Sequence, residues 1–338
     1  MTLKSIFFTS LLLFVLFSCG NDPFDIDTSK VEMDISYIDM DEAFRSSDSA
    51  TLVKEVNEYK NTIKDVYEYE FGHCLNIGNV SDSSVFGAIS SFLADEYIHR
   101  LEQRIGEKFK DKSNIENKIT EGFTYLKAHF PKEKYPKHVV FLNSLFRSSA
   151  ASFDSDVAVG LEQYLGPTSD VIVELPTNEY YQWYKQGMEA KYLERDVLAS
   201  WISANIMPAP KSGSLTEFMI HWGKIIYFVE ASFPEADKDI IIRYSKEDYD
   251  WALKNEGSFW QYLVDQKLLF VMDERTKANM LQEGPFTPGL PEKGPDRLGQ
   301  FLGWRMVQQY MDKNSDLPLS KLKDVHYNDI LQSYETIQ

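Results

Sequence analysis

The sequence predicts a mainly helical fold with a small β element, which places the chain in the α+β class. Apolar residues recur at intervals of three and four over most of its 338 residues, a spacing typical of helices that bury one face. Only three short segments carry a strand pattern, and neither an internal repeat nor a domain-scale linker is found. We therefore expect one helix-rich domain over residues 31–338.

The β element is expected in three places. Residues 31–37 alternate apolar and polar side chains, which is the pattern of a half-buried strand. Residues 139–142 form a short apolar run of the kind found in buried strands. A further strand is expected within residues 156–165, leading into a turn at Gly166 and Pro167.

Two helices begin with a predicted capping box, in which a serine and a glutamate three residues later satisfy free N–H groups at the helix start. Each helix is expected to end before a proline, because proline disfavours helical backbone in the residue that precedes it. The residues are, in order, Ser113, Glu116 and Pro131 for the first helix and Ser214, Glu217 and Pro234 for the second.

The remaining helices are expected from their apolar stripes. In chain order they lie at about 52–66, 85–105, 180–206, 246–255, 258–270 and 297–311. Gly257 is expected to separate the fourth of these from the fifth. Residues 284–294, which are rich in proline and glycine, are expected to form a loop before the last helix.

The first residues carry the signals of an exported lipoprotein, with residues 1–18 as its signal peptide. Residues 6–17 form the apolar region, and Leu16 and Ser18 precede Cys19 as in a bacterial lipobox. The apolar run of about 12 residues is shorter than the roughly 20 that cross a bilayer as a helix. We therefore expect Cys19 to carry fatty acyl chains such as palmitate.

Acylated Cys19 would be the first residue of the mature chain, followed by a polar tether over residues 19–30. The expected location is the cell envelope, with the protein held in the inner or the outer membrane by its lipid and facing the periplasm. The alternative is an ordinary secreted protein in which Cys19 is incidental. Cys74, the only other cysteine, is expected to be a small buried apolar side chain.

The charge balance limits the classes of partner. The chain has 52 Asp and Glu against 35 Lys and Arg, a formal net charge of −17. Nucleic acid is not expected as a partner, because its binding requires lysine and arginine to neutralise phosphates. The same balance argues against attraction to anionic lipid, so the acyl chains must supply the membrane anchor.

The polar residues offer few signs of catalysis. None of the six histidines is followed by glutamate, so an H-E-x-x-H metal-binding helix is missing, and we expect no metal and no cofactor. The G-x-S-x-G turn that presents a hydrolase serine is missing as well. Glu217 and His221 lie four residues apart on one predicted helix, where they can share a proton or form an ordinary surface pair.

The segment from Gly294 to Val307 is the most distinctive internal stretch. Gly299 and Gly303 lie four residues apart on the last predicted helix, where each costs roughly 1 kcal/mol relative to alanine. Two glycines on one face leave room either for another backbone or for a ligand. Arg297 and Trp304 beside them are therefore candidate packing or groove residues.

Several segments, in their order and spacing, resemble the GldB family of gliding-motility lipoproteins from Bacteroidota. The resemblance covers nearly the whole chain and begins with the lipobox cysteine. The other matching segments are residues 39–44, 160–166, 223–228, 251–256 with Trp260, and 294–307.

The resemblance implies an envelope component needed for surface gliding and connected with the type IX secretion and motility apparatus. Its partners would be other envelope proteins, and the lipid bilayer through Cys19. The family is also similar to predicted zinc peptidases, which need H-E-x-x-H and a later glutamate. These positions fall near residues 194–201, which contain no histidine, and at Trp222. The resemblance thus implies a zinc-peptidase-like scaffold without its metal site, and a non-catalytic protein.

Two other functions stay open at this point. Glu217, His221 or a pair of carboxylates such as Glu194 and Asp196 can serve an unorthodox peptidase-like hydrolase. The 22 Phe, 19 Tyr and 6 Trp residues can form a glycan-binding surface, although helix packing accounts for them as well.

Replacing Cys19 with alanine is expected to release the protein from membranes, because no thiol remains to be acylated at the lipobox. Cys74→Ala is the matched control and is expected to stay membrane-bound. The measurement is an immunoblot of membrane and soluble fractions after a carbonate wash. A Cys19→Ala protein that stays with the washed membranes contradicts the lipid anchor.

Overall fold

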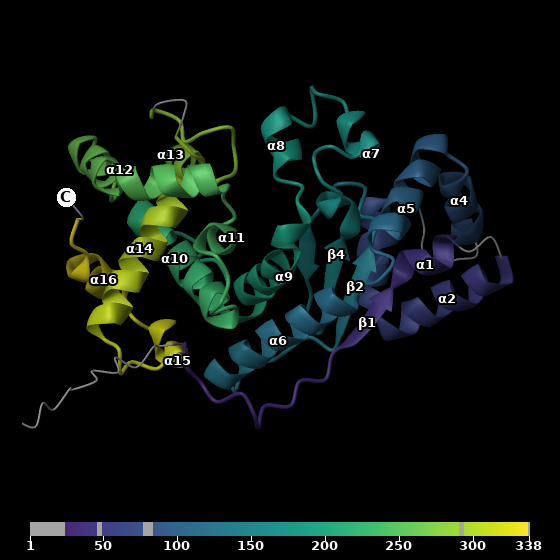
Figure 1. Ribbon diagram of the computed structural model, residues 1–338, viewed down its shortest axis with the longest axis horizontal. Helices are drawn as coiled ribbons and strands as arrows, with labels where there is room; N and C mark the ends of the chain where they lie inside the picture. Colours follow the sequence, from purple (N-terminus) through teal and green to yellow (C-terminus); the bar gives the residue numbers. More distant parts are fainter. Residues whose placement is uncertain (1–23, 46–48, 77–83, 291–293, 337–338) are drawn as a thin grey trace, which may run out of the picture.

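The computed structural model describes residues 24–45, 49–76, 84–290 and 294–336, and Figure 1 shows helices around a small sheet. The predicted class, mainly α with a small β element, is confirmed. Cys19 lies outside the described residues. Among the described helices, none combines the length and the apolar character that crossing a bilayer requires.

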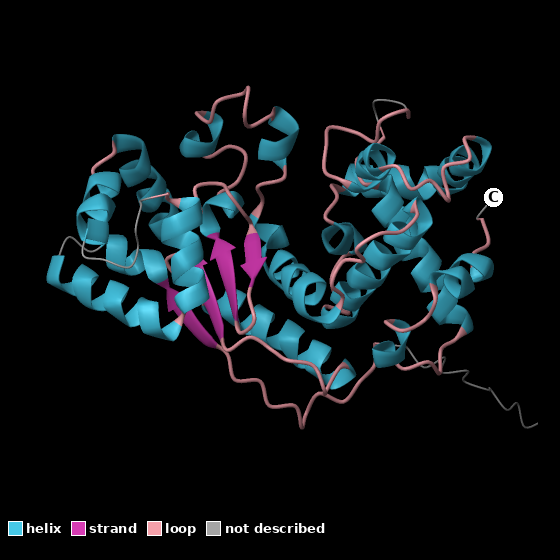
Figure 2. Cartoon of the chain, turned by 180° about the vertical axis from the view of Figure 1, so that it is seen from behind, coloured by secondary structure: helices cyan, strands magenta, loops and turns pink. Residues whose placement is uncertain are grey.

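The sheet has four strands in the order β1-β2-β4-β3 and forms the centre of one half of the molecule (Figure 2). Its strands are β1 (Ser36–Asp39), β2 (His138–Leu142), β3 (Ala150–Ser152) and β4 (Asp156–Gly160). β2 runs parallel to β1 and β4, and β3 pairs antiparallel with β4 at one edge. β2 and β4 are the buried apolar runs expected of parallel strands covered on both faces.

Two strand predictions were partly wrong. The strand predicted over residues 31–37 is found only at Ser36–Asp39, because its partner strand begins at His138, opposite Ser36. The strand predicted within residues 156–165 ends at Gly160, and a 3₁₀ turn, Leu161–Tyr164, follows.

The two faces of the sheet pack against different helices, since successive side chains of a strand point to opposite faces. Val140 and Ala158 lie in a small core with the helices near the N-terminus, whereas Val139 and Val157 lie in the main core. The small core is formed by α1 (Met40–Arg45), α2 (Ser49–Thr62), α3 (Lys64–Glu68), a π-helical turn (Tyr69–Cys74) and α4 (Ser84–Leu93). Cys74 is buried and not disulfide-bonded.

The main core continues from the sheet into the helical half of the molecule. On the sheet side lie α5 (Glu96–Lys108), α6 (Ser113–His129), α7 (Asp170–Val173), α8 (Gln182–Gln186) and α9 (Leu193–Trp201), which continues as a π-helical turn (Ile202–Ile206). The helical half contains α10 (Leu215–Ser232), α11 (Lys238–Ile242), α12 (Lys246–Asp265), α13 (Glu274–Leu281), α14 (Leu298–Lys313), α15 (Leu319–Leu322) and α16 (Tyr327–Ser333).

The helix-start signals had different outcomes. The capping box at Ser214 is confirmed, because Ser214 Oγ accepts from Glu217 N–H and the Glu217 carboxylate accepts from Ser214 N–H. The box predicted at Ser113 was wrong: Asp111 Oδ1 accepts from Ser113 N–H at 3.0 Å and from its hydroxyl. An aspartate two residues upstream therefore replaces the serine as the polar partner of this helix start.

The break predicted at Gly257 was also wrong, since α12 is one continuous helix from Lys246 to Asp265. A glycine within a helix costs about 1 kcal/mol, and burial of the apolar side chains that follow offsets this cost. Phe259 and Leu263 supply that burial.

The two glycines of the last helix serve close helix packing. A Cβ atom on Gly303 would lie 1.8 Å from the carbonyl oxygen of Met219 on α10. A Cβ atom on Gly223 of α10 would lie 2.3 Å from the carbonyl carbon of Gly303, and one on Gly299 would lie 2.8 Å from Met280 O. The backbones of α10 and α14 thus meet directly, with room for no side chain between them.

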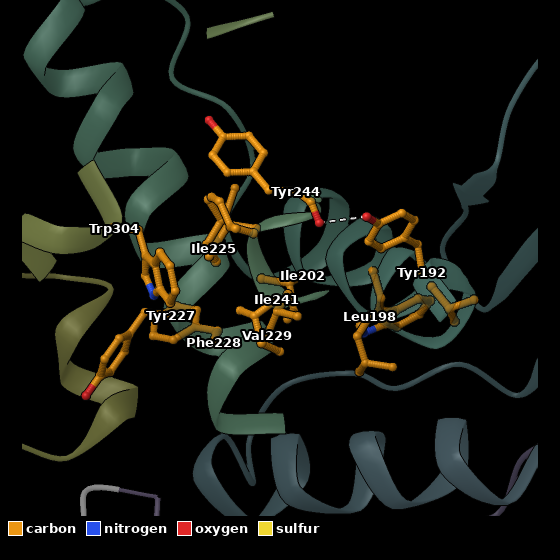
Figure 3. Close-up of a cluster of buried hydrophobic side chains, with 14 of the residues drawn as sticks. Tyr192, Leu198, Ile202, Ile225, Tyr227, Phe228, Val229, Ile241, Tyr244 and Trp304 are labelled. Atoms are coloured by element: carbon orange, nitrogen blue, oxygen red, sulfur yellow. Dashed lines mark hydrogen bonds between the residues drawn. The ribbon is translucent and has the colours of Figure 1, made fainter. Parts of the chain in front are cut away.

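Buried apolar side chains surround this contact (Figure 3). Trp304 from α14 lies beside Ile225 and Tyr227 from α10, and the cluster extends through Ile241 to Leu198 of α9. The described chain starts at this core as well: the ring of Phe24, within the predicted tether, lies 5.1 Å from that of Tyr227.

Gly303→Ala is expected to lower the free energy of unfolding by about 3 kcal/mol, because a methyl group forces α10 and α14 apart. Gly87→Ala in α4 is the matched control, since a Cβ atom there has nothing within 4 Å. It is expected to stabilise the helix by up to about 1 kcal/mol. Chemical denaturation measures both variants, and equal stabilities would contradict the close contact.

Candidate functional site

A cleft of about 960 Å³ lies between the two halves of the molecule. One wall comes from Ser149, Ala150 and residues 183–184 and 186–189, and the other from residues 243–245, 247–248, 281–285, 295–297 and 300. α9 forms the floor. In Figure 1, α8 and α13, which contribute residues to the two walls, lie above α9, with α8 on the right and α13 on the left.

Asp196 is the centre of a buried polar network on this floor. Its Oδ1 accepts from Arg195 Nη1 at 2.8 Å, and its Oδ2 accepts from Arg243 Nε at 3.0 Å and from the Tyr164 hydroxyl at 3.1 Å. Burial alone would raise the pKa of the Asp196 carboxyl, but the Arg243 and Arg195 guanidiniums more than offset this, so the pKa lies below its usual value. Both oxygens therefore accept hydrogen bonds, and the Asp196 carboxylate is negatively charged.

Arg243 and Arg297 extend the network into the second wall. Arg297 Nη2 donates to the Arg243 carbonyl at 3.0 Å, and its Nε donates to Asp296 Oδ1 at 3.0 Å. The Glu283 carboxylate lies 3.3 Å from Arg243 Nη1 and 3.6 Å from Arg297 Nη1. Each arginine N–H group that points inward thus has an acceptor, as buried guanidiniums require.

Both arginines adopt left-handed backbone conformations. Arg243 has a φ of 63° at the end of α11, and Arg297 has a φ of 49° just before α14. The sequence predicted that Arg297 lies in the first turn of the last helix. It instead precedes α14, which begins at Leu298. This conformation costs about 1–2 kcal/mol per non-glycine residue, and the hydrogen bonds of the two side chains hold it in place.

Two tyrosines support the arginines from below. The Arg243 guanidinium lies 5.1 Å from the centre of the Tyr192 ring, and that of Arg297 lies 5.4 Å from the Tyr244 ring. The Tyr192 hydroxyl donates to the Tyr244 carbonyl at 2.7 Å, the dashed line in Figure 3. Cation–π contacts thus join the polar network to the apolar core beneath it.

A second buried carboxylate shapes the edge of the cleft. Glu162 accepts hydrogen bonds from the Ser144 backbone and hydroxyl and from the Phe146 backbone. Burial raises the pKa of Glu162 to about 7, although these hydrogen bonds oppose the shift. Leu145 and Phe146 have φ values of 50° and 62°, so Glu162 holds a strained loop that leads to Ser149 at the rim.

Gln163 is a lining residue with an unmet hydrogen bond. Its side chain is buried, and its Oε1 accepts from the Tyr184 hydroxyl at 3.1 Å. Its Nε2 has no hydrogen-bond partner among the residues described. Sequence reasoning missed Gln163, because no motif marks a lone glutamine.

The structure places the predicted polar pair, Glu217 and His221, outside the cleft. The Glu217 carboxylate is held by the capping box of α10, and within the described chain no hydrogen bond joins it to His221. Burial, followed by the nearby charge of Lys224, lowers the pKa of His221 to about 4. Neither residue lines the cleft, whereas the neighbouring Trp222 does.

Of the predicted groove residues, only Arg297 lines the cleft. Gly299 and Gly303 lie in the packing contact described above. Trp304 is fully buried and donates from Nε1 to Glu230 Oε2 at 2.7 Å.

Arg195, Asp196 and Ala199 line the floor at the same i, i+1, i+4 spacing as the key residues of H-E-x-x-H. At this spacing the floor offers a paired guanidinium and a methyl group, and no imidazole. In the described ranges, no group of three or more His, Cys, Asp or Glu side chains is arranged to hold a metal ion. The resemblance in sequence singled out residues 194–201, which form this floor. It could not predict that Asp196 pairs with Arg243, because only the fold brings the two residues together.

Asp196→Asn is expected to lower the free energy of unfolding by about 3–5 kcal/mol at neutral pH, because Arg195 and Arg243 lose their anionic partner. The Asp196 carboxylate stabilises the fold above its unfolded-state pKa of about 3.9. This contribution is lost as the pH falls through the lower folded pKa, so the difference from wild type should shrink below about pH 4.

Asp170→Asn is the matched control for this measurement. Asp170 forms its ion pair with Arg104 at an exposed position, so its loss should leave stability nearly unchanged. Denaturation curves at several pH values test both variants, and equal stabilities for Asp196→Asn and wild type would contradict the network.

Comparison with known proteins supports the resemblance seen in the sequence. A family model described as "Gliding motility protein GldB" matches residues 21–335, nearly the whole chain. Searches of curated proteins and of solved structures gave no match. The chain therefore belongs to the GldB family of gliding-motility lipoproteins.

Proposed function

We propose that this protein acts without catalysis, by binding envelope protein partners of the gliding-motility and type IX secretion machinery. Membership of the family makes it a membrane-anchored envelope lipoprotein of gliding motility. The proposal adds the mode of action, the partner class and the cleft as the binding site. It also includes the periplasmic orientation expected from the signal peptide.

The state of Asp196 is the observation that carries the proposal. A general base must have a free oxygen within reach of a water or substrate proton, and a pKa near the working pH. Asp196 has both oxygens engaged by two arginines and a tyrosine, and its pKa is lowered. At the centre of the cleft, the one buried carboxylate of the floor is thus unsuited to activating water.

The serines of the cleft give no alternative nucleophile. Ser149, Ser200, Ser203 and Ser245 line it, and a serine needs an adjacent base to lose its proton. Ser245 donates to Asp248 Oδ2 at 2.7 Å, but its hydroxyl also accepts from the Asp248 N–H and serves as the N-cap of α12. The described lining residues include no histidine, lysine or cysteine. This composition favours a peptidase-like scaffold used as a binding groove over a hydrolase.

The walls of the cleft have the character of a protein-binding surface. Trp183, Tyr184 and Trp222 line it and are partly exposed. Tryptophan and tyrosine are enriched among the residues that dominate binding energy at protein interfaces, especially in desolvated pockets. The same aromatic rings can also stack on sugar rings, so the experiments below distinguish a glycan from a protein.

Trp183→Ala is expected to reduce capture of the partner at least tenfold, because an aromatic contact of this kind contributes about 2 kcal/mol or more. The measurement is a pull-down from crosslinked envelopes, with the full chain as bait and quantitative mass spectrometry as readout. Phe270→Ala is the matched control, since Phe270 is an exposed aromatic side chain outside the cleft. Equal capture by wild type and Trp183→Ala would place partner binding elsewhere.

A separate assay tests the absence of catalysis. The purified protein, supplied with zinc and incubated with a protein substrate or with peptidoglycan, is expected to leave both intact. Bound zinc together with reproducible cleavage would overturn the proposal and support the hydrolase alternative.

A further inference from the structure

We propose that the cleft recognises a polypeptide segment bearing lysine or arginine side chains. This inference rests on the proposed function and adds the chemistry of the partner. It is based on the charges that the cleft exposes, on the buried amide of Gln163 and on the aromatic wall.

In the cleft, the positively charged side chains are more deeply buried than several of the negatively charged ones. Its lining contains six carboxylates and three guanidiniums, a formal net charge of −3. The three arginine side chains are only 10–16% exposed and all are paired. Glu189 and Glu283, although they pair with Lys191 at 3.6 Å and with Arg243 at 3.3 Å, are 42% and 44% exposed. A ligand approaching from solvent therefore meets carboxylates, which attract cationic groups.

Glu247 is the carboxylate best placed to take a new partner. It is exposed at the rim, in the first turn of α12, and its side chain forms no ion pair or hydrogen bond with any residue of the described chain. Lysine and arginine side chains are the cations that a protein partner supplies, and Glu247 can pair with either one. The described lining residues include no lysine, and the nearby Lys191 pairs with Glu189 rather than with Glu247.

The unpaired amide of Gln163 indicates that the ligand offers a peptide backbone. A buried amide group without a partner is unfavourable, so a ligand that satisfies it gains affinity. With Nε2 unpaired, a carbonyl oxygen of the ligand satisfies it. If the amide were turned, Oε1 would be the unpaired atom and would need an N–H donor. A polypeptide segment offers both groups at every residue, which a simple cation does not.

The aromatic wall complements these polar groups. Trp183 and Tyr184 stand on the same wall as Glu189 and Gln163. Aromatic faces attract lysine and arginine side chains through cation–π contacts. Their apolar surface also accommodates the methylene stems of these side chains. The wall thus suits a cationic side chain better than an acidic one.

Fluorescence anisotropy tests the proposal with the full chain in detergent and three labelled peptides of one length. These carry lysine, glutamine or glutamate at the same alternating positions. The lysine peptide is expected to bind about tenfold more tightly than the glutamine peptide, with the glutamate peptide weakest. Its affinity should fall as salt is added, since exposed charges are screened.

Two variants locate the interaction. Glu247→Lys is expected to weaken the lysine peptide about tenfold, whereas Asp312→Lys, an equal charge change at an exposed site of α14 outside the cleft, should not. Gln163→Met is expected to weaken binding about fivefold without lowering the melting temperature. A lower melting temperature with unchanged affinity would assign Gln163 a purely structural role and remove it from the proposal.

The outcomes separate this inference from the proposed function. Equal binding of all three peptides, or no effect of Glu247→Lys, overturns the cationic specificity but leaves the pull-down result with Trp183→Ala intact. Binding of oligosaccharides and of none of the peptides overturns it in favour of a glycan ligand. Cleavage of the bound peptide overturns the non-catalytic function itself.

Discussion

The direct contact between the backbones of α10 and α14 is the constraint on which the rest of the structure depends. With Gly303 against the Met219 carbonyl, the separation of the two helices is fixed by main-chain atoms alone. The start of α14 is therefore fixed as well, and Arg297 is placed over Arg243 and beside Asp296. The second wall of the cleft is thus positioned by a packing contact deep in the helical half.

The hydrogen bonds and ion pairs of Arg243 and Arg297 then hold the walls of the cleft in position. Buried ion pairs are poor sources of net stability, because the desolvation of two charges offsets much of their attraction. Their value here is geometric: they hold two left-handed residues, Arg243 and Arg297, and tie α9 to both walls. The desolvation cost agrees with the binding role that we propose for the cleft.

Local signals in the sequence predicted local features. The capping box at Ser214 and the buried strand near residues 139–142 both depend on neighbours within a few positions. The errors came from competing neighbours and from tertiary contacts. Asp111 replaced Ser113 at a helix start, and packing of Phe259 carried α12 through Gly257. The centre of the cleft escaped prediction because Asp196 and Arg243 are 47 positions apart and only the fold brings them together.

Docking of Phe24 on α10 has a mechanical consequence for a lipid-anchored protein. Only five residue steps separate the predicted anchor, Cys19, from Phe24, a reach of at most about 18 Å. With Cys19 acylated as predicted, so short a link would keep the domain close to the bilayer and restrict its rotation. In Figure 1 the first described residues lie beside α15, at the lower edge, while α8 and α13, which contribute to the walls of the cleft, lie at the upper edge. A force exerted by a partner bound in the cleft would therefore be transmitted through the core around α10 to the membrane anchor.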